Sequence, residues 1–215
     1  MARLHLFDLD GTLLMGTAAP IEISLQLGLG DEIAVIEQEF VNGRLRPAEY
    51  AQRVRELWAD LTPADVTAAF EGAPWMSGIR EAWAQIRARG EYVAVVSLSP
   101  SFFVERLLGW GAHAAHGSVF PSVPFTAPVD PTGVLDAAGK LRIADSLCAA
   151  FGLTRSDCVA YGDSLTDAEL FAAIGESVAV NADHLLAERA RYTYTGHDLR
   201  EACELVVPRH GVTGA

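Results

Sequence analysis

Residues 7–14 read Phe7-Asp8-Leu9-Asp10-Gly11-Thr12-Leu13-Leu14. They follow the apolar run of residues 4–7, which predicts a short β-strand near the N-terminus. Asp8 and Asp10 are two residues apart, which in a strand places them on one face, and Gly11 allows the backbone to turn where the strand ends, so both carboxylates can converge. Paired carboxylates at the carboxyl end of a strand suit nucleophilic attack, proton transfer and hard-cation binding. An Asx-turn is the other explanation of Asp-Gly-Thr, but the preceding strand favours a catalytic loop.

The composition argues against several classes of protein. The chain has 215 residues, half of them hydrophobic, which suits one substantial domain or a core domain with an insert. A formal net charge of −12 argues against nucleic-acid binding through a basic face. No apolar stretch approaches the roughly 20 residues that a membrane span needs, and the N-terminus lacks the regions of a signal peptide. We therefore expect a cytoplasmic protein with no membrane partner; the sequence carries no signal about its oligomeric state.

The residues from position 79 onward alternate between short apolar segments and helical segments. We expect strands at residues 3–7, 92–96, around 118–120, 158–161, 178–180 and 192–194. We expect helices at residues 79–88, 102–108, 140–151, 167–174 and 184–190. This alternation predicts an α/β fold, a Rossmann-like parallel sheet with helices on both faces, whose ligands bind at the carboxyl ends of the strands.

Residues 21–70 have helical spacing and no strand signal. The helical stripes comprise Ile33, Ile36, Glu37 and Phe40, and then Tyr50, Val54, Leu57 and Leu61. We therefore expect two parts, an α/β core formed by residues 1–15 and 77–215 and a small all-helical cap formed by residues 16–76. Pro74 and Gly78 bracket a hinge-like stretch before the core resumes. We expect the tail from Pro208 to be disordered.

Four predicted loops carry polar residues that a parallel sheet can bring together at one edge. They hold Asp8 with Asp10, Ser97, Lys140, and Asp163 with Asp167. Four carboxylates in one cleft repel each other, and each pair at about 4 Å costs roughly 4 kcal/mol at an effective dielectric constant near 20. One lysine does not offset that repulsion, so a divalent hard cation is implied, and Mg²⁺ fits carboxylate, carbonyl and water ligands.

Each of these residues has a simpler explanation when it is taken alone. Ser97 could be an ordinary helix N-cap, and Asp163 and Asp167 could be acids that complement a helix dipole. Lys140, the only lysine among 16 basic residues, could lie on a solvated face or could supply a compact ammonium that arginine cannot replace. The occurrence of all these residues together, in this order, favours one functional site.

With these residues in place, the chain resembles the haloacid dehalogenase (HAD) superfamily of phosphatases over almost its whole length. The segment from Asp8 to Thr12 is similar to the first motif of that superfamily, Ser97 to the second and Lys140 to the third. The segment from Gly162 to Ser164, together with Asp167, is similar to the fourth motif. Residues 16–76 resemble a C1-type cap, and residues 95–109 and 161–181 resemble the phosphoserine phosphatase-like branch.

The resemblance implies roles for both aspartates of the first motif. Asp8 would attack phosphorus and form an aspartyl-phosphate. Asp10 would protonate the leaving oxygen and then activate the hydrolytic water. The dehalogenases of the superfamily lack an acid at the second position, because a halide leaves without a proton, so the presence of Asp10 indicates phosphoryl transfer.

The resemblance also implies a phosphate site and a metal site. Ser97 and the backbone amide of Leu98 would hold the phosphoryl oxygens, and Lys140 would neutralise them and the nucleophile. Asp163, with the Asp8 carboxylate and the Asp10 carbonyl, would bind Mg²⁺. Asp167 would support the metal shell or orient Lys140.

The resemblance identifies the residues that would bind the substrate less clearly than the catalytic ones. Thr17 stands where phosphoserine phosphatases place a glutamate for the substrate amine, and Glu22 lies about one turn further on. Arg53 is a counterpart of the cap arginine that meets the substrate carboxylate, although it also fits a solvated helix face. Trp75 in the hinge could form a substrate wall. Leu98-Ser99 replaces the Gly-Gly of the family.

These residues predict a Mg²⁺-dependent phosphomonoesterase that acts on a small phosphorylated metabolite. Phosphoserine phosphatase proper and a phosphotransferase that passes the phosphoryl group to an alcohol remain alternatives with the same core motifs. A non-catalytic sensor of a phosphorylated ligand is a third reading, which the presence of Asp10 disfavours. The sequence does not identify the phosphate ester.

Overall fold

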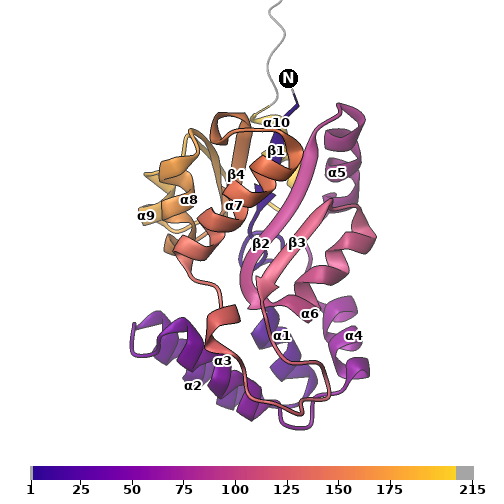
Figure 1. Cartoon of the computed structure of the whole chain (residues 1–215), viewed down its shortest axis with the longest axis vertical. Helices are drawn as coiled ribbons and strands as arrows, with labels where there is room; N and C mark the ends of the chain where they lie inside the picture. The colour runs from indigo at the N-terminus through magenta and orange to yellow at the C-terminus, as the bar shows by residue number, and fades with distance from the viewer. Residues whose placement is uncertain (1, 207–215) are drawn as a thin grey trace, which may run out of the picture.

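A six-stranded parallel sheet forms the centre of the protein in a computed structural model that describes residues 2–206 (Figure 1). The strand order is β3-β2-β1-β4-β5-β6, and every neighbouring pair is parallel. The strands are β1 (Leu4–Phe7), β2 (Tyr92–Pro100), β3 (Ala114–Ser118), β4 (Cys158–Gly162), β5 (Glu176–Val180) and β6 (Tyr192–Tyr194). The sheet grows from β1 in both directions, so the strand order reverses there, and such switch points are where α/β sheets bind ligands. The predicted Rossmann-like α/β fold is confirmed.

Helices cover both faces of this sheet because its strands alternate buried side chains between the two faces. Leu4 and Leu6 of β1 pack with helices α7, α8 and α9, whereas Phe7 packs on the opposite face with α5 and α10. These helices are α5 (Ile79–Ala88), α6 (Ser101–Val104), α7 (Ala137–Phe151), α8 (Ala168–Ala173), α9 (His184–Ala187) and α10 (Leu199–Glu204). Short 3₁₀ helices are η1 (Glu105–Trp110), η2 (Pro131–Gly133), η3 (Arg155–Asp157) and η4 (Leu165–Asp167).

Four further helices lie beyond the carboxyl ends of the strands, at the bottom of Figure 1. They are α1 (Ala19–Gln26), α2 (Gly30–Val41), α3 (Pro47–Leu57) and α4 (Pro63–Gly72). Thr62 caps α4 by accepting a hydrogen bond from the backbone of Asp65, as its position before a proline suggests. The fully buried Trp58 donates from Nε1 to Ser24 Oγ at 2.8 Å and so ties the end of α3 to α1.

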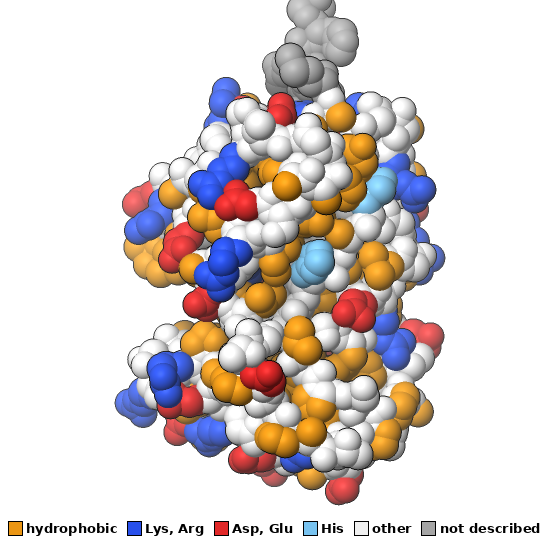
Figure 2. Space-filling view, viewed as in Figure 1, with side chains coloured by type: hydrophobic (Ala, Val, Ile, Leu, Met, Phe, Trp, Pro, Cys, Tyr) orange, Lys and Arg blue, Asp and Glu red, His pale blue; other side chains and the backbone are white. Residues whose placement is uncertain are grey.

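We propose that residues 16–76 act as a cap on the remaining α/β core. Figure 2 shows the outline narrowing between the sheet region and the helical region, and basic and acidic side chains intermingle on this face. The two connections between these regions pair with each other, because Met15 N donates to Pro74 O and Met76 N donates to Leu13 O, both at 2.9 Å. The hydrophobic core nevertheless runs continuously from the sheet into the helices.

Several element boundaries differ from the predicted ones. Strand β2 continues past residue 96 to Pro100, which pairs with Ser118 across a bulge, although the apolar signal ends at Val96. Strand β3 lies at residues 114–118, earlier than expected, because its small residues carry no apolar pattern. The helix predicted at 102–108 is the short α6 followed by η1. The tail from Pro208 lies outside the described residues. Within residues 2–206, no helix combines the length and apolar character needed to cross a bilayer.

Candidate active site

Asp8 lies directly after the central strand, next to the loop that follows β4. Its backbone N–H donates to Tyr161 O at 2.9 Å and continues the ladder between β1 and β4, which leaves the carboxylate at the sheet edge. Gly11 has a φ of 71°, and a Cβ at this position would lie 2.0 Å from a carboxylate oxygen of Asp163. The glycine therefore serves both the turn and the close approach of the two acidic loops.

Lys140, in the first turns of α7, is buried between two carboxylates. Its Nζ lies 2.9 Å from Asp8 Oδ1 and donates to Asp167 Oδ1 at 2.8 Å, and the side chain is only 1% exposed. Burial opposes the charged form, but the negative charges of Asp167 and Asp8 outweigh it and raise the pKa of Lys140. Lys140 is therefore a fixed cation at the carboxyl end of β1.

The acidic groups around Lys140 exceed the charge that one lysine offsets. Burial and the neighbouring charge of Asp167 raise the pKa of Asp163 to about 7, and the same two causes raise the pKa of Asp8. Ligand oxygens of Asp8, Asp163 and Asp167 lie within 4.8 Å of one another. Asp8 and Asp163, whose pKa values are raised, converge with Asp167, and a hard divalent cation would stabilise such a donor set in its ionised form, so these residues fit such an ion.

The carboxylate of Asp10 turns away from this cluster and is held by three hydrogen bonds. Its Oδ1 accepts from the backbone of Ala19 at 2.8 Å, and its Oδ2 accepts from Ser99 Oγ at 2.7 Å and from Ser97 Oγ at 3.1 Å. Burial raises the pKa of Asp10, and these hydrogen bonds oppose the shift. The side chain is thus fixed beside the acidic cluster without belonging to it.

The two serines of β2, the predicted phosphate-binding Ser97 and Ser99, lie differently with respect to the cavity. Ser97 is fully buried behind Asp10, and its Oγ also accepts from the backbone of Ser99 at 3.1 Å. Ser99 and Leu98 line the cavity, whereas Ser97 does not. Sequence reasoning missed Ser99, although its spacing of two from Ser97 within a strand places both hydroxyls on one face.

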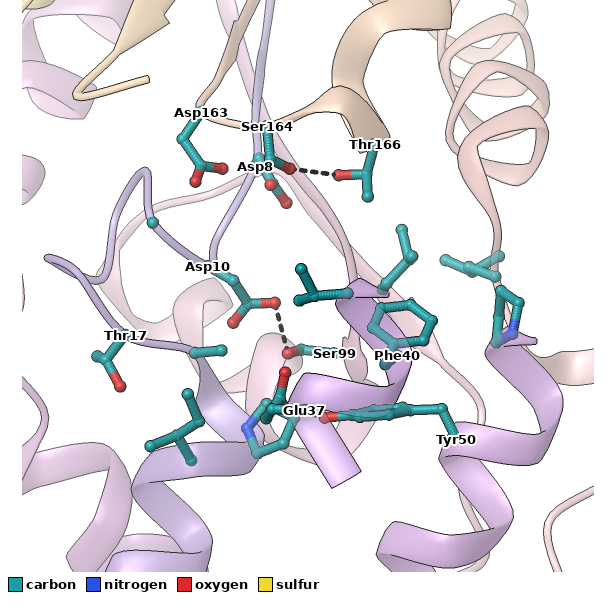
Figure 3. A pocket seen from close by; sticks show the side chains of 18 of the residues that line it. Asp8, Asp10, Thr17, Glu37, Phe40, Tyr50, Ser99, Asp163, Ser164 and Thr166 are labelled. Carbon is teal, nitrogen blue, oxygen red and sulfur yellow. Dashed lines mark hydrogen bonds between the residues drawn. The ribbon is translucent and has the colours of Figure 1, made fainter. Parts of the chain in front are cut away.

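A cavity of about 630 Å³ opens in front of these residues, between the sheet edge and the helical region. Its charged floor comprises Asp8, Asp10, Lys140, Asp163 and Asp183. Its opposite wall comes mainly from α1, α2 and α3, and Figure 3 shows Glu37, Phe40 and Tyr50 facing the acidic loops. Much of the remaining lining is apolar, including Ile21, Val41, Phe120, Val134 and Leu135.

Only one of the four predicted substrate residues lines this cavity. Thr17 does so, and its Oγ1 donates to Glu22 at 2.7 Å, so Glu22 acts as the partner of a lining residue. Arg53 is not among the lining residues and pairs with Glu39 on the helical surface. Its neighbour in sequence, Gln52, accepts from the loop that precedes α7.

Trp75 also lies away from the cavity. Its ring packs with Phe70, Phe103 and Trp110, and its Nε1 donates to Phe70 O at 2.7 Å. The tryptophan side chain therefore helps to join α4, α6 and η1 and is not brought to the proposed substrate site. A large aromatic residue beside a hinge cannot be distinguished by sequence from one that faces a ligand.

Sequence reasoning missed Glu37 and Tyr50 as lining residues. Tyr50 donates its hydroxyl hydrogen bond to Glu37, which joins α3 to α2 across the cavity wall. A signal was present, because Glu37 stands on the same helical stripe as the apolar residues Ile33, Ile36 and Phe40. A carboxylate on such a stripe needs a partner or a ligand, since burying it without one is unfavourable.

The chain is similar to known phosphoserine phosphatases in sequence and in structure. A phosphoserine phosphatase of Methanocaldococcus jannaschii is 28% identical over 207 residues, which cover 95% of this chain and 97% of that protein. A solved complex of substrate-bound phosphoserine phosphatase superposes with a TM-score of 0.81 at 25% identity, covering 96% of this chain and 99% of the other. A phospho-aspartyl intermediate analogue of phosphoserine phosphatase gives a TM-score of 0.80 at 26% identity, with the same coverage.

The family model of haloacid dehalogenase-like hydrolases matches residues 5–172 and so spans the first, second, third and fourth motifs. Together with the relatives, this match confirms the prediction of a HAD-type phosphatase of the phosphoserine phosphatase-like branch. Over most of its length, from β1 to α8, the chain therefore belongs to the haloacid dehalogenase-like hydrolases.

Proposed function

We propose that the protein is a Mg²⁺-dependent phosphomonoesterase that hydrolyses a small phosphorylated metabolite through an aspartyl-phosphate. The observation that carries this proposal is the cluster at the end of β1, where Lys140 Nζ lies 2.9 Å from Asp8 Oδ1 at the floor of a largely apolar cavity. The resemblance to a phospho-aspartyl intermediate analogue of phosphoserine phosphatase supports the same chemistry.

In the first step, a carboxylate oxygen of Asp8 attacks phosphorus. The bond from phosphorus to the ester oxygen breaks, and Asp10 gives that oxygen a proton so that it leaves as an alcohol. In the second step, Asp10 takes a proton from water, which attacks phosphorus. The bond from phosphorus to Asp8 then breaks and inorganic phosphate leaves.

The chain's own residues prepare these steps by position and charge. Lys140 is a fixed cation beside Asp8 and can neutralise the negative charge of the phosphoryl oxygens. Catalysis of phosphoryl transfer depends mainly on positioning and on such charge neutralisation. Ser99 and Ser97 hold Asp10 in one orientation, next to the site where the leaving oxygen would lie. The backbone amide of Leu98 is a further candidate to bind phosphoryl oxygens.

Asp8, Asp163 and the Asp10 carbonyl would hold the Mg²⁺ ion, and Asp167 would support it. When bound, the ion supplies charge neutralisation for the phosphoryl group. The raised pKa values of Asp8 and Asp163 support this assignment, because a divalent cation would keep both groups ionised at neutral pH.

The function is tested by measuring phosphate release from a panel of small phosphomonoesters, with and without Mg²⁺. The panel includes p-nitrophenyl phosphate, phosphoserine and aminoalkyl phosphates. The Asp8→Asn variant removes the nucleophile, and Asp145→Asn is the matched control, because Asp145 forms an ion pair with Arg155 away from the site. We expect Mg²⁺-dependent release that is lost in Asp8→Asn and retained in Asp145→Asn.

Two results would contradict this proposal. Absence of release from every ester by folded protein with Mg²⁺ present would indicate a ligand sensor. Release that slows when an alcohol is added, while the alcohol becomes phosphorylated, would indicate a phosphotransferase.

A further inference from the structure

The cavity wall formed by α2 and α3 carries an acidic side chain, and the arginine that the resemblance suggested for the substrate carboxylate does not line it. Glu37 of α2 lines the cavity, and Arg53 of α3 does not. Figure 3 shows Glu37 between Tyr50 and the hydrogen-bonded pair of Asp10 and Ser99. The electrostatic influence of Asp10 on Glu37 supports this proximity, because burial and the charge of Asp10 both raise the pKa of Glu37. The alcohol portion of a bound ester would therefore lie close to the Glu37 carboxylate.

Acidic side chains outnumber basic ones in the described lining of the cavity, and this excess of negative charge affects which alcohol portion can bind. Lys140 is the only basic side chain among the described residues that line it. Its ammonium is already engaged by Asp8 and Asp167, on the side where the phosphoryl group would bind. A second acidic group on the substrate, such as a carboxylate, would meet Glu37 and find no cation opposite to it.

Glu37 itself retains unused hydrogen-bonding capacity. An ionised carboxylate has about four lone-pair sites for donors. Among the residues that the structure describes, Tyr50 is the one donor to Glu37, and no basic side chain pairs with it. Glu37 is half-buried and has a single neutral partner, so a cationic donor from the ligand would complete the site.

The surroundings of Glu37 suit an organic ammonium better than a free metal ion. The rings of Phe40 and Tyr50 lie 4.6 Å apart beside it, and Val41, Ile21 and Pro47 supply further apolar lining. Apolar walls accommodate a short carbon chain, and aromatic rings attract an organic cation through their negatively charged faces. Hard metal ions prefer several oxygen ligands, which this wall does not offer.

We propose that Glu37, oriented by Tyr50, selects a phosphomonoester whose alcohol portion carries an ammonium group and no acidic group. This proposal rests on the proposed phosphomonoesterase function and narrows its substrate class to aminoalcohol phosphates. It separates the protein from enzymes specific for phosphoserine, whose substrate carries a carboxylate as well as an amine.

The test compares aminoalkyl phosphates of two to six carbons with hydroxyalkyl phosphates of the same length and with phosphoserine. We expect the highest kcat/KM for one aminoalkyl ester. In Glu37→Gln, kcat/KM for that ester should fall about 10- to 100-fold, the range expected when a charged hydrogen bond becomes neutral. The values for the matched hydroxyalkyl ester and for p-nitrophenyl phosphate should change less than about threefold. Glu32→Gln, on the exposed side of α2, is the control and should change none of these values.

A binding measurement separates failure of this proposal from failure of the hydrolase. Aminoalkyl and alkyl phosphonates of equal length resist hydrolysis, and calorimetry with Mg²⁺ measures their affinities without turnover. We expect tighter binding of the aminoalkyl phosphonate to the wild type and loss of that preference in Glu37→Gln. Equal affinities in the wild type, or an equal loss for both ligands in the variant, would overturn the proposal even if esters are hydrolysed. Absence of turnover together with a Glu37-dependent preference would instead overturn the proposed hydrolysis.

Discussion

Lys140 Nζ lies 2.9 Å from Asp8 Oδ1, although α7 and β1 are separated by more than half of the chain. The same ammonium donates to Asp167 at 2.8 Å, so one side chain links the first, third and fourth motifs. Because all three groups are almost fully buried, replacing Lys140 would leave two buried carboxylates without their shared cation. The proposed catalytic arrangement and part of the stability of the fold therefore depend on the same contacts.

Replacing Lys140 should affect both activity and stability. In Lys140→Met, Asp8 and Asp167 lose their shared cation, and we expect kcat to fall at least about 1,000-fold because the phosphoryl charge is no longer neutralised. We also expect the free energy of unfolding to fall by about 3–5 kcal/mol, as when one partner of a buried ion pair is removed. Kinetics with Mg²⁺ and urea unfolding measure the two effects.

The control for this variant is Arg142→Ala, which removes an exposed cation from the same helix. Its ion pair with Asp136 is solvent-exposed, so the expected change in stability is within about 1 kcal/mol. If Lys140→Met retained most of the activity, the assignment of the site to the end of β1 would be wrong.

We expect Gly11 to be required for metal binding because it leaves space for the Asp163 carboxylate, in addition to allowing a left-handed backbone. In Gly11→Ala the new Cβ would lie 2.0 Å from an Asp163 carboxylate oxygen, so the Asp163 side chain must shift. Gly28→Ala is the matched control, because Gly28 has almost the same φ, 72°, and a Cβ there meets nothing within 4 Å. Both variants should lose about 1–2 kcal/mol of stability from the left-handed backbone.

Only Gly11→Ala should also weaken activation by Mg²⁺. We expect this variant to need at least a tenfold higher Mg²⁺ concentration than the wild type for half-maximal activity. Titration of phosphate release with Mg²⁺ measures this value in both variants. Equal Mg²⁺ dependence in the two alanine variants would mean that the space left by Gly11 is not needed to place the Asp163 carboxylate.

The sequence was sufficient to predict that polar residues after separate strands and at a helix start converge at one place. Asp8, Lys140 and Asp163 follow from apolar strands and a helix start, and the parallel order of β2, β1 and β4 places them at one edge. Periodicity could not place the cap residues in the same way. Arg53 and Glu37 both lie on amphipathic helices, and whether either faces the cavity depends on how α2 and α3 pack, which is a tertiary property.

The different roles of Ser97 and Ser99 also required the structure. Sequence reasoning stopped at Ser97 because the apolar run ends at Val96, yet β2 continues to Pro100 through a bulge. Both hydroxyls reach Asp10, and the cavity is lined by the second one. Boundaries of this kind are set by pairing with β3, whose residues carry no apolar pattern.

Ser99 should contribute to catalysis through Asp10. Ser99→Ala removes the 2.7 Å hydrogen bond to Asp10 Oδ2, and we expect a roughly tenfold decrease in kcat because the carboxyl group loses a fixed orientation. KM should change little, since the serine hydroxyl is engaged with Asp10. Ser118→Ala is the control, because Ser118 is also buried near β2 but donates to Leu98 O. A decrease in kcat of the same size in both variants would point to a general disturbance of β2.

Glu91 should stabilise the protein in a pH-dependent manner, far from the catalytic edge. It accepts from Arg3 Nε and Arg89 Nε at 2.8 Å and lies 3.2 Å from His5 Nε2. Burial alone would raise the pKa of Glu91, but hydrogen bonds from His5, Arg3 and Arg89 outweigh it and lower the pKa to about 2, from an ordinary value of 4.5. A carboxyl group with a lowered pKa stabilises the folded state above its unfolded pKa, and this contribution is lost as the pH falls from about 4.5 toward 2.

We therefore expect Glu91→Gln to lower the free energy of unfolding at pH 7 by about 1.5–3 kcal/mol, the range for hydrogen bonds to charged groups. The difference from the wild type should shrink as the pH is lowered from 4.5 toward 2, because the wild-type carboxylate becomes protonated there. Urea unfolding at a series of pH values measures this difference. Glu49→Gln is an exposed comparison, because the ion pair of Glu49 with Arg46 should contribute little to stability. A difference that stays constant down to pH 2 would mean that Glu91 acts by packing, because a charge effect must follow its ionisation.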